Sequence, residues 1–475
     1  MLILFTIAAY FALLLLLSRF TSRQSDNDTF FRGRRQSPWY MVAFGMIGAS
    51  ISGVTFVSVP GMVMQTQMTY LQTCIGFIFG YIAVAFILLP LFYRNNLTTI
   101  YSYLNQRLGQ QSYRSGAAFF LLSKMTGAAI RFYLVCMILH RFMLAHYGIP
   151  FPLTVLTMVL LIWLYTRRSG IRTLVWTDTL QTACMFAALI LIIISVVRQL
   201  GITPAEAISA IRADEGSRIF VFDDWMSRQN FFKQFFSGIF IVIVMTGLDQ
   251  DMMQKNLTCR NLREAQKDMC TYGTLFFPAN LLFLSLGILL TILATNKGIA
   301  IPSAGDELLP MFAATGLLGQ SVVVLFTLGI VAASFSSADS ALTAMTTSCC
   351  VDIFRRPDDE HLRRKVHIAI AAVFIAIIIA VDNLNSTSVI DAIYTLCSYT
   401  YGPLLGLFAY AICCGKDTNA NRNEGIAPYI ICLLSPLVCH AISLITLHAT
   451  GYHFGYELLM LNGLLTFLGL AAFRR

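Results

Sequence analysis

The chain has 475 residues, of which 57% are hydrophobic and only 12% are charged, and its formal net charge is +9 at pH 7. Apolar runs of about twenty residues recur from end to end, which indicates a polytopic α-helical membrane protein and leaves no room for a soluble domain. The twelve cysteines form no CxxC pair and the seven histidines form no HExxH spacing. No nucleophile–base pair or zinc-ligand pattern is visible, so an enzyme is not expected.

The apolar runs predict about thirteen membrane-spanning helices. The first, over 2–17, has no basic residue before it and no small-residue cleavage site after it, so it is expected to be a retained helix. Within the long polar interval 198–230, Pro204 to Arg212 predicts a short surface helix. The other spans are expected at 38–64, 70–93, 115–143, 150–166, 172–198, 231–254, 268–295, 319–350, 365–382, 388–413, 426–447 and 454–473.

Basic residues cluster in every second connection between these spans. Lys255, Arg260 and Arg263, for example, follow the seventh span, whereas the alternate connections are nearly free of Lys and Arg except for the long interval 198–230. Because cytoplasmic loops carry the excess of basic residues, the N-terminus is predicted outside and the C-terminus in the cytoplasm. This placement explains the net positive charge without a nucleic-acid partner. We also expect an integral plasma-membrane protein, with a bacterial inner membrane favoured.

The second span contains the stretch GASISGVTFVSVPG, from Gly48 to Gly61. Gly48 and Gly53 each lower helix stability by about 1 kcal/mol, and Pro60 removes a backbone donor. Loosened carbonyls in a membrane need a neighbouring helix, water or an ion to satisfy them. Two interpretations follow: a broken helix whose carbonyls and hydroxyls line a binding cavity, or small residues that permit close helix packing.

Two spans carry isolated charges. Asp178 lies in the stretch WTDTLQ, and a carboxylate at that depth is a cation or proton site, or forms a hydrogen bond in helix packing near the cytoplasmic end. Arg131 lies within the span 115–143, where it would either bind an anionic substrate or pair with a carboxylate of the protein. The residues alone leave both choices open.

The stretch AASFSSADS, over 332–340, places several small polar groups close together. Positions 333, 336, 337 and 340 share one face of a helix, with Asp339 beside it. Hydroxyls combined with unwound carbonyls suit a hard monovalent cation that must later leave. The alternative is that these serines bond back to their own helix.

These stretches together resemble the sodium/solute symporter family, which includes sodium-coupled carriers of glucose, proline, iodide, monocarboxylates, multivitamins and sialic acid. The resemblance runs from about Trp39 to Phe408. One departure is TRRSGIRT (166–173), a cytoplasmic turn where the family usually has a double glycine. The matching motifs occur in the family's order: GASISGVTFVSVPG (48–61), LPLFYRNNLTTIYSYLNQRLG (89–109), LVWTDTLQ (174–181), GLDQDMMQKNLTCRNLREAQK (247–267), AASFSSADSALTA (332–344) and YTYGPLLGLF (399–408).

The resemblance implies an all-α fold of five-plus-five inverted repeats. The first helix of each repeat would be broken, at Gly48–Thr55 and near Gly247. The implied organisation is an N-terminal peripheral helix and basic cytoplasmic loop (1–37), a transport core (38–413) made of repeats 38–198 and 231–413, and C-terminal peripheral helices (414–475).

The resemblance also implies two cation sites. A second site, known in some sialic-acid carriers, would have Asp339 where those carriers have a hydroxyl, so it would be more acidic or would take a proton. The shared sodium site maps onto Gly48, Ile51, Ala333, Ser336 and Ser337, and the second onto Asp178, Ser336, Asp339 and Ser340.

The implied substrate pocket favours an anion. The positions that bind sugar in the galactose carrier map onto Thr55, Met245 and Thr395, which are poor in hydrogen-bonding groups and disfavour a hexose. The sialic-acid carrier's pocket maps onto Ser50, Ser52, Thr55 and Arg131, which retain hydroxyls and a carboxylate-binding arginine.

The resemblance therefore implies a sodium-coupled secondary active symporter that imports an organic anion, with sialic acid as one candidate. Sodium would be the coupling ion, and the protein would act as a monomer in the bilayer. The alternatives are a carrier of a neutral solute or an inorganic anion and, from another class, a membrane sensor built on a transporter fold.

Overall fold

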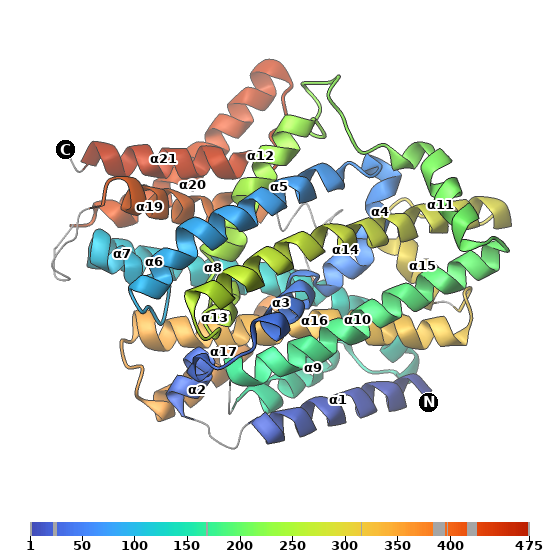
Figure 1. Ribbon diagram of the computed structural model, residues 1–475, viewed down its shortest axis with the longest axis horizontal. Coiled ribbons are helices and arrows are strands. Elements are labelled where there is room, and N and C mark those ends of the chain that lie inside the picture. Colours follow the sequence, from blue (N-terminus) through green and yellow to red (C-terminus); the bar gives the residue numbers. More distant parts are fainter. Residues whose placement is uncertain are drawn as a thin grey trace.

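The computed structural model describes residues 2–21, 26–167, 170–314, 316–382, 395–396, 398–415 and 425–473. Within these ranges the chain is helical, and its only β-type pairing is an isolated bridge between Ser37 and Cys259 (Figure 1). Seven of the described helices are long and apolar enough to span a membrane, and two further spans are bent helix pairs. The prediction of a polytopic, all-α membrane protein is confirmed.

Apart from the span expected over 388–413, the predicted spans agree with the helices to within about six residues. The seven unbroken spans are α5–α6 with the π-helical turn η2 between them (Tyr70–Arg94), α8 (Gln110–Leu139), α10 (Ile171–Leu200), α14 (Leu262–Lys297), α16 with the π-helical turn η8 (Gln320–Ile353), α17 (Glu360–Val381) and α20 (Ala427–Thr450). Shorter apolar helices are α1 (Leu2–Thr21), α9 (Phe151–Thr166), α19 (Gly402–Cys413) and α21 (Leu458–Phe473).

The remaining helices connect the spans. They are α2 (Asn27–Arg32), η1 (Gly33–Arg35), α7 (Ser102–Arg107), η3 (His140–Leu144), η4 (Ala145–Tyr147), α11 (Pro204–Ala213), η5 (Glu215–Ser217), η7 (Gly305–Glu307) and α15 (Leu308–Ala314). The predicted surface helix is confirmed as α11. Part of the span expected over 388–413, namely 388–394 and 397, lies outside the described residues, so the total of thirteen spans stays a prediction.

Helix ends follow their capping residues. Asn261 precedes α14, and its side-chain oxygen accepts a hydrogen bond from the Glu264 amide at 3.0 Å, which satisfies one of the free amides of the first turn. Gly298 follows the same helix in the left-handed conformation, with a φ of 65°, which favours glycine. These two residues fix where the 36-residue helix begins and where it ends.

Two spans are sharply bent. The helices α3 (Trp39–Ser50) and α4 (Gly53–Thr66) meet at 61°, and α12 with the π-helical turn η6 (Phe231–Gly247) meets α13 (Gln250–Asn256) at 70°. The breaks predicted at Gly48–Thr55 and near Gly247 are therefore confirmed. Pro60 does not form the first break as its missing donor suggested, because it lies inside α4.

Close packing also accounts for the glycines at the first bend. A Cβ atom on Gly48 would collide with the Thr182 hydroxyl on α10, and one on Gly53 would collide with the Ser334 hydroxyl on α16. Both interpretations of this stretch therefore hold, since the helix is broken and its small residues let α10 and α16 approach it.

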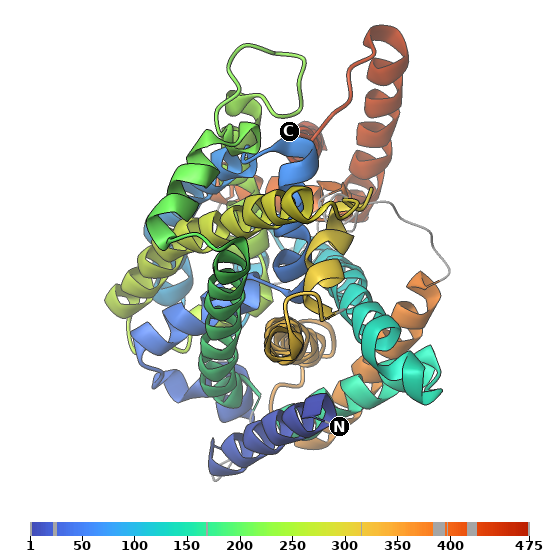
Figure 2. The ribbon, with the colours of Figure 1, turned by 90° about the vertical axis from the view of Figure 1, so that its right-hand side faces the viewer.

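The helix α16 forms the centre of the molecule. In Figure 2 it is seen nearly end-on, inside a ring of other helices. Almost every residue from Phe326 to Ser348 is buried, which is expected of a helix enclosed on all sides. The helix α1 runs along one edge, and α20 and α21 lie on the opposite side (Figure 1). The core thus places the serine run of α16 next to the first bend.

Candidate ion and solute site

A pocket lies beside the bend between α3 and α4. Its lining includes Ser50, Ser52 and Thr55 from that bent span, Arg131 from α8 and Met245 from η6. The structure therefore brings together five of the six residues predicted to bind substrate. They come from helices far apart in the chain, and the bend exposes the first three to the pocket.

Thr395, the sixth predicted residue, lines a neighbouring chamber instead. That chamber also contacts Gln65 on α4, Arg228 in the long interval 198–230 and Tyr456 before α21. Tyr70 at the start of α5 lines both spaces. Thr395 is therefore placed at an adjoining vestibule rather than among the hydroxyls of the pocket.

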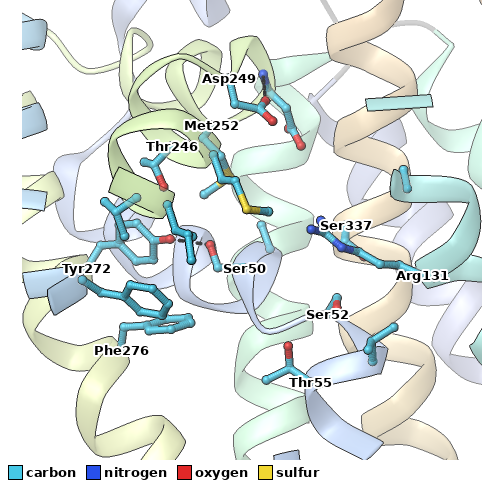
Figure 3. Close-up of a pocket in the computed structure, with 18 of the residues that line it drawn as sticks. Ser50, Ser52, Thr55, Arg131, Thr246, Asp249, Met252, Tyr272, Phe276 and Ser337 are labelled. Carbon is cyan, nitrogen blue, oxygen red and sulfur yellow. Dashed lines mark hydrogen bonds between the residues drawn. The ribbon is translucent and has the colours of Figure 1, made fainter. Parts of the chain in front are cut away.

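Arg131 is half-buried and is directed towards the cavity. Figure 3 shows it reaching into the pocket beside Ser337, on the side opposite Tyr272 and Phe276. Among the residues that the structure describes, no carboxylate forms an ion pair with Arg131. Of the two interpretations that the sequence left open, pairing within the protein is not observed. Its guanidinium is a donor available to a solute.

The two acidic residues of the pocket, Asp249 and Asp251, form ion pairs with Lys124 rather than with Arg131. The Lys124 ammonium on α8 lies 3.1 Å from Asp249 Oδ2 and 2.6 Å from Asp251 Oδ2. The Tyr401 hydroxyl donates to Asp249 Oδ2 at 2.6 Å. Sequence analysis did not assign these residues to the site. The only signal available was their position, because Asp249 and Asp251 flank the start of α13 directly after the second bend.

The opposite wall is aromatic and orients one predicted hydroxyl. Tyr81 on α5 donates to the Tyr272 hydroxyl on α14 at 2.7 Å, and Tyr272 is hydrogen-bonded to Ser50. Phe77 and Phe276 extend this apolar surface. The pocket thus offers an arginine and hydroxyls on one side and an apolar surface on the other, the combination typical of small-molecule sites.

The first predicted cation site lies at the bend itself. The Ile51 amide donates to the Ile47 carbonyl at 2.8 Å and the Phe56 amide donates to the Ser52 carbonyl at 3.0 Å. Within the described ranges, no hydrogen bond satisfies the carbonyls of Gly48 and Ile51. These are the two carbonyls that the family resemblance assigns to sodium, and unsatisfied buried carbonyls need a partner.

The serines of α16 supply the facing groups. Ser334 and Ser337 do bond back to their own helix, since the Ser337 hydroxyl donates to the Ser334 carbonyl at 3.0 Å and Ser334 donates to Ile330. Ser336 does not, because its hydroxyl donates to Asp178 Oδ1 on α10 at 2.7 Å. Ala333 precedes them on the same buried helix. A hydroxyl that donates its single hydrogen keeps lone pairs for a cation.

The second predicted site is assembled, but with additional residues. The Tyr165 hydroxyl on α9 donates to Asp339 Oδ2 at 2.6 Å, and the Ser340 hydroxyl donates to Asp339 Oδ1 at 3.2 Å. Asp178 Oδ2 lies 2.7 Å from the ammonium of Lys255 on α13. The assignment of Lys255 to a basic cytoplasmic connection is therefore wrong, because the bend turns α13 inward and buries this side chain.

Two bent helices, with unsatisfied carbonyls at the first bend and hydroxyls and intramembrane charges beside it, are typical of secondary active transporters. Residues 30–421 match the sequence profile of the sodium:solute symporter family, so the chain belongs to that family. It is an integral membrane transporter, and sodium is its coupling ion.

Its relatives transport different solutes. The chain is 24% identical over 456 residues to the sodium/sialic acid symporter SiaT of Proteus mirabilis, covering 89% of this chain and 87% of the relative. It is also 24% identical over 398 residues to the human sodium/iodide cotransporter, covering 81% and 61%. Among solved structures, a sodium-coupled sialic acid symporter in a substrate-bound outward-open state matches with a TM-score of 0.83 at 20% identity, covering 99% and 96%.

Proposed function

We propose that this symporter imports an organic anion and that Arg131 binds the carboxylate of that anion. One observation carries the proposal: Arg131 reaches into the pocket without a carboxylate partner among the described residues, whereas Lys124 engages both Asp249 and Asp251. A charged side chain inside the membrane is costly unless it serves a partner or a substrate. An anionic solute would supply the missing partner.

Sialic acid is one candidate for that anion. The relatives SiaT of Proteus mirabilis and NanT of Aliivibrio fischeri are named as sialic acid symporters, and a bovine relative is named as a monocarboxylate transporter. All these solutes carry a carboxylate, which a guanidinium binds through paired hydrogen bonds. The hydroxyls of Ser50, Ser52 and Thr55 would bind the rest of the solute, and the aromatic wall would cover its apolar part.

Sodium would couple to this pocket through the first cation site. Its ligands would be the carbonyls of Gly48, Ile51 and Ala333 and the hydroxyls of Ser336 and Ser337. Sodium would hold the bend against α16 and favour an outward-open state; solute would then bind, and both would be released inside. We further propose that repeats 38–198 and 231–413 rock against each other, with the N-terminus outside, and that the protein acts as a monomer.

The test is solute binding to the purified protein, measured by thermal shift with and without sodium. The panel would contain sialic acid, a short monocarboxylate, iodide and a hexose. We expect a carboxylate to stabilise the wild type, and more so with sodium, because the two sites adjoin. Arg131→Ala should bind that carboxylate at least about 100-fold more weakly, since it removes one partner of a buried charged pair.

Arg131→Lys and Arg198→Ala complete the set. The first keeps the charge but loses the forked geometry, so partial binding is expected. The second removes an exposed arginine at the end of α10 and should behave as the wild type. Stabilisation by a hexose or by iodide alone, or full carboxylate affinity in Arg131→Ala, would contradict the proposal.

A further inference from the structure

The second cation position of this protein contains a positive charge of its own. The Lys255 ammonium lies 2.7 Å from Asp178 Oδ2, with 2% of the lysine side chain and 1% of the aspartate side chain exposed. The two residues come from different helices, α13 and α10. We propose that Lys255 occupies the place of the second sodium ion, so that the protein binds one sodium and not two; this inference rests on the proposed first sodium site.

An ammonium and a sodium ion compete for the same place. Both carry a single positive charge and both contact a carboxylate oxygen directly. A buried lysine must remain paired, because leaving its charge without a partner in a low-dielectric interior is strongly destabilising. Sodium therefore cannot displace Lys255 from Asp178 without leaving that charge uncompensated.

The other oxygens of the position are also engaged. Asp178 Oδ1 accepts a hydrogen bond from Ser336, while the two oxygens of Asp339 accept from Tyr165 and Ser340. Three of the four carboxylate oxygens thus accept a hydrogen bond from the protein, and the fourth, Asp178 Oδ2, forms the ion pair with Lys255. Sodium binds through oxygen lone pairs, so it would have to break one of these contacts as well as the ion pair.

The same contacts connect the place of the second ion to the first sodium site. Lys255 holds Asp178, and Asp178 takes the hydrogen of the Ser336 hydroxyl at 2.7 Å, which leaves the lone pairs of Ser336 for sodium. This chain of contacts links α13, α10 and α16. It joins the second bent helix to the ligands beside the first one.

The test is sodium stoichiometry, measured by equilibrium binding of radioactive sodium to the purified full-length protein. The wild type should bind one sodium per chain. Lys255→Ala removes the ammonium and leaves two carboxylates and the hydroxyls of Ser336, Ser340 and Tyr165, so it should bind two sodium ions. Its sodium-dependent stabilisation should change from a hyperbolic curve to a sigmoidal one, with a Hill coefficient between one and about two.

Lys255→Arg and Lys297→Ala are the controls, since the first keeps the charge and the second removes an exposed lysine at the end of α14. Both should bind one sodium. Two sodium ions on the wild type, or a single one on folded Lys255→Ala, would overturn the proposal. If Lys255→Ala does not fold, the wild-type stoichiometry decides alone. A wild type that binds no sodium would overturn the first site on which this inference rests.

Discussion

Single side chains determine which ions and solutes the site can hold. Lys124 and Lys255 are both buried against carboxylates, whereas Arg131 faces the pocket. The difference matters because a charge that is paired within the protein holds helices together, whereas a charge without a protein partner attracts a ligand of opposite sign. Ser336 and Ser334 differ in the same way: one hydroxyl turns to another helix and the other bonds to its own.

Ser336→Ala and Ser337→Ala each remove one oxygen ligand from the proposed sodium site with little change in volume. We expect the sodium affinity of each variant to fall at least about tenfold, which corresponds to about 1.4 kcal/mol. Sodium titration of thermal stability measures this directly. Ser334→Ala is the matched control, because that hydroxyl bonds to the Ile330 carbonyl and is not a predicted ligand. Equal sodium affinity in all three variants would show that Ser336 and Ser337 are not sodium ligands.

At the scale of helices, the bends create the site by freeing carbonyls that a straight helix would satisfy. The sequence could predict the first bend because glycine, serine and threonine interrupt an apolar run, and the second because Gly247 opens a recognisable motif. It could not decide between a break and close packing, since both require small residues. Only the spatial arrangement shows Gly48 against α10 and Gly53 against α16.

Gly53→Ala tests whether this close approach serves sodium binding. A Cβ atom there would collide with Ser334 and Val135, so it should push α4 away from α16 and cost about 1–3 kcal/mol of stability. Sodium affinity should fall at least about tenfold, because the carbonyls and hydroxyls would no longer reach one ion.

Gly127→Ala is the matched control for that substitution. It lies inside α8, where an added Cβ atom would meet nothing within 4 Å, so the change should stabilise the helix by about 0.5–1 kcal/mol. Thermal unfolding and sodium titration compare the two variants. Gly53→Ala with the stability and sodium response of Gly127→Ala would show that the contact is dispensable.

At the scale of the whole molecule, the lengths of the apolar runs were sufficient to predict the helices. The order of motifs was sufficient to predict the family. It was also sufficient to predict that Ser50, Ser52 and Thr55 share one pocket with Arg131. Ion pairs between distant helices were not predictable from local patterns. Lys255 illustrates this limit, because it resembles the basic residues of a cytoplasmic loop until the bend at 247–250 places it beside Asp178.

Uptake by vesicles that contain only this protein tests the central claim most directly. The measurement is accumulation of labelled carboxylates, with sialic acid first, under an inward sodium gradient and a negative interior. With one sodium carried per monovalent anion, the cycle moves no net charge and the membrane potential adds nothing. The inward sodium gradient should therefore by itself accumulate a solute bound at Arg131 above its external concentration. Accumulation should disappear when the sodium gradient is collapsed. Folded, sodium-binding protein that accumulates none of the organic anions would contradict the account and favour a sensor or a carrier of another solute.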